Sequence, residues 1–275
     1  GGNLGLPLSE AVGGNFNIAA VEVSSYQMEF PGTFHPRAAA ILNVTPDHLE
    51  RHGSMENYAA HKCRLFAQMT AEDTAILPCD SPLLIEASRP CSGRIRWLGR
   101  QPGVEVEPER GGMYFVEAPE VISLQKFPLM GLHNQQNLAA ALLLALSVGV
   151  QPQRIDLTRL TGLPHRLERV AERNQVRWIN DSKATNVDST LVALQAMDRP
   201  TLLLLGGRGK AKAHYELLKE HLQSVKTIFC FGEEGPVIAE TLQPFPVQVL
   251  PGLAEAVQQA AQQAQPGDTV LLSPA

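Results

Sequence analysis

The sequence carries Val176-Arg-Trp-Ile-Asn-Asp-Ser-Lys-Ala-Thr-Asn186 and, after one more helical pattern, Thr201-Leu-Leu-Leu-Leu-Gly-Gly-Arg-Gly-Lys210. Each stretch starts as a largely apolar run of strand length and ends in small and polar residues. A buried strand that leads through a polar loop into a helix is the repeating unit of a mostly parallel sheet. These two stretches therefore predict an α/β fold.

The same alternation of short apolar runs and helical patterns extends through the rest of the chain. Strands are predicted at residues 18–25, 38–45, 74–78, 176–180, 201–205, 227–231, 247–250 and 269–272. Helices are predicted at residues 55–69 and 134–150 and between the later strands. From residue 94 to 127, short alternating strands predict a small antiparallel excursion. The stretch Thr161-Gly-Leu-Pro164 breaks both element types, so we predict a domain boundary there.

Composition and charge argue against several functional classes. The chain has 275 residues, a formal net charge of −5 and 44% hydrophobic residues, as expected of a folded soluble protein. An acidic balance argues against a nucleic-acid partner, because phosphates are bound by many Lys and Arg side chains. The longest strongly apolar stretch, residues 138–150, is too short to span a membrane. The four cysteines have no paired spacing, so we expect neither a zinc site nor a disulfide framework, and a cytoplasmic location.

Polar residues end two of the predicted strands of the first domain. Glu22 and Ser24 lie at the end of the first run, and Asp47 and His48 follow the second. Neighbouring parallel strands would bring these side chains to one edge of the sheet, where α/β proteins bind ligands. Glu22 and Asp47 carry the oxygen donors that Mg²⁺ prefers. The alternative is that Ser24 and Asp47 only cap the helices that follow.

Two further segments of the first domain are candidates for ligand binding. Lys62 lies on a predicted helix one turn after Tyr58, and a solvated helix face is the alternative to a functional lysine. Asn134 and Asn137 lie three residues apart at the amino end of the long helix, after His133. Their amides could bind a nucleotide base or phosphate, or Asn134 could simply cap the helix.

The second domain offers an arginine and two loops. Arg166 follows His165 just beyond the boundary, where it could clamp a phosphate or form an interdomain salt bridge. Residues 180–186 are all small or polar, and their mixture of an acid, a lysine and hydroxyls favours a substrate loop over an exposed turn. The glycine turn that ends at Lys210 can approach an anion, although it does not match the spacing of a phosphate loop.

Taken in order, these segments resemble the Mur ligases. The segments that carry the resemblance are Gly1-Gly-Asn3, Glu22-Val-Ser-Ser-Tyr-Gln-Met-Glu29, Asn43-Val-Thr-Pro-Asp-His48, Tyr58-Ala-Ala-His-Lys62, Gly131-Leu-His-Asn-Gln-Gln-Asn137, His165-Arg166, residues 180–186 and Gly206-Gly-Arg-Gly-Lys210. The match runs from the first residue to the last. The loop at residues 180–186 is similar to that of the family members that add D-glutamate.

The resemblance implies an ADP-forming acid–D-amino-acid ligase of peptidoglycan synthesis. Such an enzyme uses ATP to phosphorylate UDP-N-acetylmuramoyl-L-alanine, and D-glutamate then displaces the phosphate. The implied architecture is a three-layer central ATPase domain over residues 1–162 and a smaller Rossmann-like domain over residues 163–275, with ATP in the cleft between them. The implied cofactors are ATP, Mg²⁺ at two sites and a carbamylated lysine. The implied partners of this monomer are small molecules, with neither nucleic acid nor membrane among them.

The resemblance also implies roles for individual residues. Glu22 and His48 match magnesium ligands of the family. The resemblance thus favours His48 as the ligand, whereas residue type alone favours Asp47. Lys62 matches the lysine that is carbamylated. Asn3 and Ser24 match contacts to the muramoyl substrate; Asn134, Asn137, Arg166 and Asp181 match ATP contacts; Lys183, Thr185 and Lys210 match the D-glutamate site; and His165 matches a position near the reacting groups. The implied catalytic residues are Lys62, His165 and Lys183.

The sequence departs from the family pattern at both ends and in one loop. The family's UDP-binding domain and phosphate loop would precede Gly1, and residues that close over D-glutamate would follow Ala275. Arg208 stands where Asp or Gly is usual. We therefore expect the chain to be inactive by itself. The alternatives are a non-catalytic nucleotide-binding fragment and a ligase similar to folylpolyglutamate synthetase, against which the loop at residues 180–186 argues.

Overall fold

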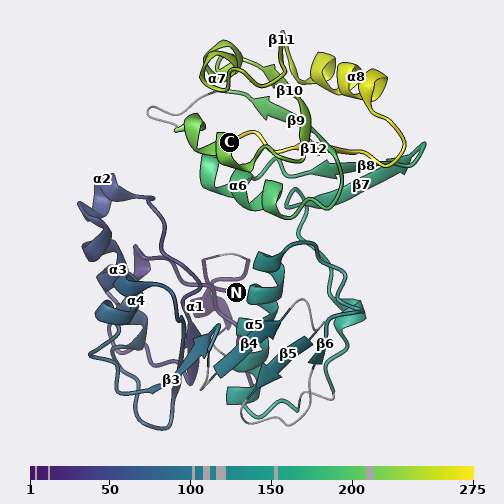
Figure 1. The fold of residues 1–275 in the computed structure, drawn as a ribbon. Coiled ribbons are helices and arrows are strands. Elements are labelled where there is room, and N and C mark those ends of the chain that lie inside the picture. Colours follow the sequence, from purple (N-terminus) through teal and green to yellow (C-terminus); the bar gives the residue numbers. More distant parts are fainter. Residues whose placement is uncertain are drawn as a thin grey trace. The chain divides into compact units, whose positions relative to one another are not determined.

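The computed structural model describes the chain except for Leu4, Val12 and residues 101–102, 108–111, 116–121, 152–153 and 209–213. The chain divides into two compact units, each with its own sheet and helices (Figure 1). The first unit comprises Gly1–Phe127 and Gln135–Asp156, and the second comprises Pro128–Asn134 and Leu157–Ala275. The predicted α/β fold is confirmed.

The first unit contains a six-stranded sheet whose strands follow the order of the chain. They are β1 (Ala38–Ala40), β2 (Thr74–Pro78), β3 (Arg94–Leu98), β4 (Gly103–Glu107), β5 (Gly112–Phe115) and β6 (Ile122–Ser123). The first four strands are parallel, whereas β5 and β6 each run antiparallel to the strand before. Strand β2 is buried along its whole length inside the parallel part, which explains its largely apolar sequence.

The remaining elements of the first half of the chain are helices. They are α1 (Leu8–Ala11), α2 (Leu49–His52), α3 (Met55–Cys63), α4 (Pro82–Ala87), α5 (Leu132–Ser147) and the 3₁₀ turns η1 (Gln27–Glu29) and η2 (Arg64–Phe66). Helix α3 begins after Ser54, whose hydroxyl accepts the N–H of Asn57 at 3.2 Å. Its apolar side joins a core with Phe66 and Leu77. Of the helices that the structure describes, none has the length and apolarity needed to cross a membrane.

The second unit contains a six-stranded sheet in the order β11-β10-β9-β12-β8-β7. Its strands are β7 (Glu168–Arg173), β8 (Val176–Asn180), β9 (Thr201–Gly206), β10 (Val225–Phe231), β11 (Val247–Leu250) and β12 (Thr269–Leu272). All are parallel except β7, which pairs antiparallel with β8. Because the chain returns to place β12 between β8 and β9, the carboxyl ends of these three strands are neighbours at one edge.

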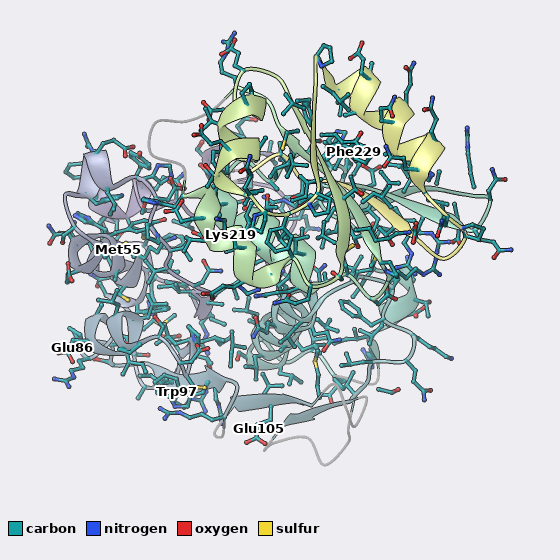
Figure 2. All side chains as sticks on the ribbon, turned by 45° about the horizontal axis from the view of Figure 1, so that its top comes forward. Met55, Glu86, Trp97, Glu105, Lys219 and Phe229 are labelled. Carbon is teal, nitrogen blue, oxygen red and sulfur yellow. The ribbon has the colours of Figure 1, made fainter. Side chains whose placement is uncertain are left out.

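Helices cover both faces of this second sheet and give the unit three layers. Helix α6 (Val187–Gln195), the 3₁₀ helix η6 (Tyr215–His221) and α7 (Gly235–Thr241) pack on one face, and α8 (Leu253–Gln263) packs on the other. Leu203 and Leu205 point into the first core, whereas Leu202 and Leu204 point into the second, where Phe229 is fully buried (Figure 2). A strand covered on both faces needs an unbroken apolar run. The unit has the predicted Rossmann-like arrangement.

Several predicted elements differ in the structure. The strand predicted at residues 18–25 is wrong, because this segment makes a single isolated bridge, between Gly2 and Glu22, and Ile18 is 57% exposed. The strand predicted to reach residue 45 ends at Ala40, and the helix predicted to reach residue 69 ends at Cys63 before η2. The antiparallel part begins at β5 instead of residue 94, since β3 and β4 are parallel. Neither α4 nor β7 was predicted.

A buried carboxylate joins the amino ends of β1 and β2. The side chain of Asp73, directly before β2, has no exposed surface, and its Oδ2 lies 2.6 Å from His35 Nε2 and 2.7 Å from the backbone N of Thr70. Arg37 Nη1 donates to Oδ1 at 3.2 Å. The hydrogen bonds from His35 and Thr70 lower the pKa of Asp73 from 3.8 to about 2. The ionised carboxylate therefore fastens the segment before β1 to the turn before β2.

We expect Asp73→Asn to lower the free energy of unfolding at neutral pH by about 2 kcal/mol, the equivalent of a pKa lowered by nearly two units. Because the pKa is lower in the folded protein, this contribution is present above the unfolded pKa near 3.8 and is lost as the pH falls toward 2. Urea unfolding across this range should show the two proteins converging. Asp80→Asn, at an exposed carboxylate, is the control and should stay within about 0.5 kcal/mol of wild type. Equal stabilities at neutral pH would contradict the prediction.

Candidate functional site

The amino-terminal segment lies beside the segment that contains Glu22. Gly2 forms a parallel bridge with Glu22, the Asn3 N–H donates to the Glu22 carbonyl at 2.9 Å, and Asn3 Nδ2 donates to Glu22 Oε1 at 3.1 Å. Gly2 has a φ of +97°, and a Cβ there would lie 2.3 Å from the Glu22 carbonyl oxygen, so glycine is required. The structure thus brings a predicted magnesium ligand and a predicted substrate contact together.

Ser24 and Asp47 make local hydrogen bonds. The Ser24 hydroxyl accepts the N–H of Gln27 at 3.3 Å, and Gln27 Oε1 accepts the N–H of Ser24 at 2.8 Å. Asp47 Oδ1 accepts the N–H of His48 at 2.9 Å. The N-cap residues of η1 and α2 are Tyr26 and His48, and neither helix start has a side-chain cap hydrogen bond, so the alternative that Ser24 and Asp47 cap these helices is wrong.

Five rings gather at α2, at α3 and just before η1. This ring cluster consists of Tyr26, His48, His52, Tyr58 and His61. The ring of His48 is edge-on to Tyr26, with centroids 5.1 Å apart, and to Tyr58, with centroids 6.4 Å apart. Lys62 Nζ lies 4.8 Å from the centroid of Tyr58. Two residues predicted at the metal, His48 and Lys62, therefore approach the same tyrosine.

Most of this ring cluster was not predicted from the sequence. His52 is 5% exposed and follows His48 by four residues, so both lie on one face of a helical turn, and this spacing was the available signal. The predicted link between Glu22 and His48 through neighbouring strand ends is wrong, because neither residue lies in a strand. Among the described residues, no hydrogen bond, ion pair or ring contact joins Glu22 to His48 or Lys62.

In the second unit, Asp181 connects three segments. It is 7% exposed; its Oδ1 accepts the N–H of Leu167 at 3.0 Å, and its Oδ2 accepts the hydroxyl of Ser273 at 3.0 Å. The Ser273 hydroxyl also lies 3.1 Å from Thr190 Oγ1 on α6. Burial raises the pKa of Asp181 above its usual value, while the bonds from Leu167 and Ser273 act in the opposite direction. Asp181 thus anchors the predicted substrate loop at the carboxyl ends of β8 and β12.

The loop at residues 180–186 is partly buried. Ala184 is 2% exposed, and Asn186 caps α6 by accepting the N–H of Ser189 at 2.8 Å. Lys183 and Thr185 are exposed between these anchored positions. His165 adjoins the loop, since its Nδ1 lies 2.9 Å from Asn180 Nδ2 and its carbonyl accepts the N–H of Lys183 at 3.1 Å.

The remaining candidate residues are Asn134, Asn137, Arg166 and Lys210. Asn134 lies inside the first turn of α5 and donates from Nδ2 to the Met130 carbonyl at 2.7 Å, so the alternative of an N-cap is wrong. Asn137 follows one turn later and is exposed. Arg166 is exposed, and no carboxylate of the described part of the chain forms an ion pair with it. Lys210 lies outside the described residues.

The donors present fit a magnesium ion that substrate phosphates help to hold. Glu22 offers a carboxylate fixed at one oxygen by Asn3, and Asp47 and Glu50 lie 3.5 Å and 3.9 Å from nitrogens of the His48 ring. Within the described ranges, no three His, Cys, Asp or Glu side chains group closely enough to hold a metal by themselves. Mg²⁺ retains waters and binds phosphates, so a sparse set of protein oxygens suits it.

Two family models match the chain. The model of the Mur ligase middle domain matches residues 3–145, and the model described as Mur ligase, glutamate ligase domain matches residues 165–275. The matched ranges include all the candidate residues named above.

Relatives and a solved structure match over nearly the whole chain. It is 41% identical over 296 residues to the UDP-N-acetylmuramoylalanine–D-glutamate ligase of Anaeromyxobacter dehalogenans and 38% identical over 290 residues to the ligase of the same name of Pelotomaculum thermopropionicum. Both alignments cover 100% of this chain but 64% and 63% of those proteins, so the chain spans less than two thirds of their length. The structure of MurF ligase from Thermotoga maritima in complex with ADP shares the fold, with a TM-score of 0.73 at 17% identity over 98% of this chain and 67% of that one.

Proposed function

The chain belongs to the Mur ligase family, and from that premise we propose that the full-length protein is an ATP-dependent ligase that joins D-glutamate to UDP-N-acetylmuramoyl-L-alanine. The observation that carries this proposal is the identity of 38% and 41%, along the whole chain, to ligases of that name. The anchored loop with exposed Lys183 and Thr185 supports it, because a second domain of this kind must offer polar side chains to an amino acid.

The proposed reaction has two steps. The carboxylate of the muramoyl substrate takes the γ-phosphoryl group of ATP, which gives an acyl phosphate and ADP. The amine of D-glutamate then attacks the acyl carbon, phosphate leaves with the electron pair of the C–O bond, and the nitrogen loses a proton as the amide forms. A free carboxylate resists amines because it has no good leaving group. The protein must therefore hold the reactants in line and neutralise their charge.

In this proposal, Glu22, His48 and Lys62 hold magnesium in the first unit. Bound magnesium would neutralise charge on the transferred phosphoryl group. Carbamylation turns the Lys62 ammonium into an anion, which is the charge that a side chain facing a metal cation requires. The shared approach of His48 and Lys62 to Tyr58 supports their acting at one place.

The other residues are proposed to bind the reactants. We assign Asn3 and Ser24 to the muramoyl substrate; Asn134, Asn137, Arg166 and Asp181 to ATP; Lys183, Thr185 and Lys210 to D-glutamate; and His165 to the vicinity of the reacting groups. The exposed guanidinium of Arg166 suits bidentate contact with a phosphate. Asp181 is already bonded through both oxygens, so it would present its remaining lone pairs from a fixed position.

Phosphate release by the full-length protein tests this function. With ATP, Mg²⁺, D-glutamate and UDP-N-acetylmuramoyl-L-alanine present, we expect one phosphate per amide formed, and omission of either substrate should abolish release. Turnover with a folate and L-glutamate instead would favour a ligase similar to folylpolyglutamate synthetase. Nucleotide binding without any turnover would favour a non-catalytic protein. Either result would contradict the proposal.

A further inference from the structure

A buried tyrosine of the ring cluster lies close to His48 and Lys62, the two side chains that we propose to act at the metal. Tyr58 lies on α3 and is 6% exposed. Lys62, one helical turn later, holds Nζ 4.8 Å from the centroid of its ring. The ring of His48 meets it edge-on, at an interplanar angle of 87°. The position of the Tyr58 ring therefore bears on the positions of both His48 and Lys62.

Tyr58 is held in turn by residues of two other segments. His52 stacks on it, with centroids 5.0 Å apart and planes 17° apart, and Asn57 Nδ2 donates to the His52 carbonyl at 3.2 Å, which joins α2 to α3. Nε2 of His52 lies 3.1 Å from the hydroxyl of Ser25, and both residues are 5% exposed. Ser25, His52 and Tyr58 thus form a buried column that we call the ring column.

We propose that the ring column positions His48 and Lys62 for metal binding, and that Tyr58 and His52 act as positioning residues that do not themselves touch the metal. The inference rests on the proposed function in that His48 and Lys62 act at a bound cation. A lysine side chain loses much rotamer freedom when a ligand fixes it. Contact with a buried ring restricts that freedom beforehand, and preorganisation of this kind strengthens binding.

The ring of Tyr58, and not its hydroxyl, makes these contacts. The test therefore compares a variant that removes the ring with one that removes only the hydroxyl. Mn²⁺ serves as the probe, bound to the full-length protein with a non-hydrolysable ATP analogue and followed by the electron paramagnetic resonance of the free ion. Tyr58→Leu should weaken Mn²⁺ binding about tenfold or more, as changes to residues that support metal ligands do. Tyr58→Phe keeps the ring and should bind Mn²⁺ within about twofold of wild type.

Phe66→Leu is the matched control, because Phe66 is 1% exposed in the core of the same unit and makes none of the ring contacts described above. It should lower the melting temperature without changing Mn²⁺ affinity. If Tyr58→Leu binds Mn²⁺ as tightly as Phe66→Leu does, the ring column contributes to packing alone. That result would overturn the inference and leave the proposed function standing. If wild type binds no Mn²⁺, both are overturned.

A milder variant keeps the test decisive where Tyr58→Leu does not fold. Ser25→Ala removes a single hydroxyl at the far end of the ring column, 3.1 Å from His52. Loss of one hydrogen bond should weaken Mn²⁺ binding about threefold through the stacked rings. Unchanged affinity in a folded Ser25→Ala protein would overturn the positioning role.

Discussion

Replacing Lys62 with alanine in the full-length protein should lower ligase turnover by about a hundred- to a thousandfold, the usual cost of removing one group that stabilises charge in a reaction. If Lys62 is carbamylated as we propose, the variant loses the negative oxygens that face magnesium. The loss falls on the step in which phosphoryl charge develops, so kcat should fall more than KM rises. Steady-state phosphate release with saturating substrates measures it.

Chemical rescue and two further variants distinguish a carbamylated Lys62 from a cationic one. Short carboxylates such as acetate should restore part of the activity of Lys62→Ala, because a small anion can occupy the vacated space. Lys62→Arg keeps the positive charge but cannot form the carbamate, so it should be inactive and resist rescue. Lys219→Ala, at an exposed lysine of η6 (Figure 2), should behave as wild type. Full activity of Lys62→Ala would make Lys62 a solvated helix residue, and an active Lys62→Arg would show that a cation is needed.

The five parallel strands of the second unit could be predicted because both faces of its sheet are covered, whereas the antiparallel edge strand β7 could not. Strand β9 is buried at every residue, and an unbroken leucine run of this length is typical of such a strand. Residues 18–25 have a similar length and some apolar residues, yet they pair through one bridge at Glu22 and leave Ile18 exposed. Local sequence does not distinguish the two cases, because burial depends on which segments become neighbours.

For the candidate site too, the sequence indicates some features and not others. Contiguous motifs such as the loop at residues 180–186 could be proposed as candidate sites from the sequence because their polar residues are adjacent in it. The anchors of those motifs could not, since Ser273 bonds to Asp181 across 92 residues and Ser25 meets His52 across 27. A hydrogen bond between distant segments leaves no periodic signal. It emerges only when the sheet and helices bring the segments together.

Selection of D-glutamate should depend on Lys183, Thr185 and Lys210. D-glutamate carries two carboxylates, and a site that selects it must offer a cation or hydroxyl to each. The first two residues follow β8 and Lys210 follows β9, and these parallel strands flank β12, so both loops leave from the same edge of the sheet. We expect Thr185→Ala and Lys210→Ala to raise the KM for D-glutamate about ten- to a hundredfold, as one lost charge-assisted contact does, and to leave the KM for ATP nearly unchanged.

Steady-state kinetics with each substrate varied in turn measures this selectivity. Lys183→Ala should also lower kcat, because Lys183 adjoins His165, which we place near the reacting groups. Ser182→Ala removes a hydroxyl from an exposed neighbour in the same loop and should leave both KM values near wild type. A defect of Lys210→Ala that is selective for ATP would move this lysine to the nucleotide site. Thr185 is exposed beside the buried Ala184. If Thr185→Ala left the KM for D-glutamate unaltered, D-glutamate would not contact the loop through the Thr185 side chain.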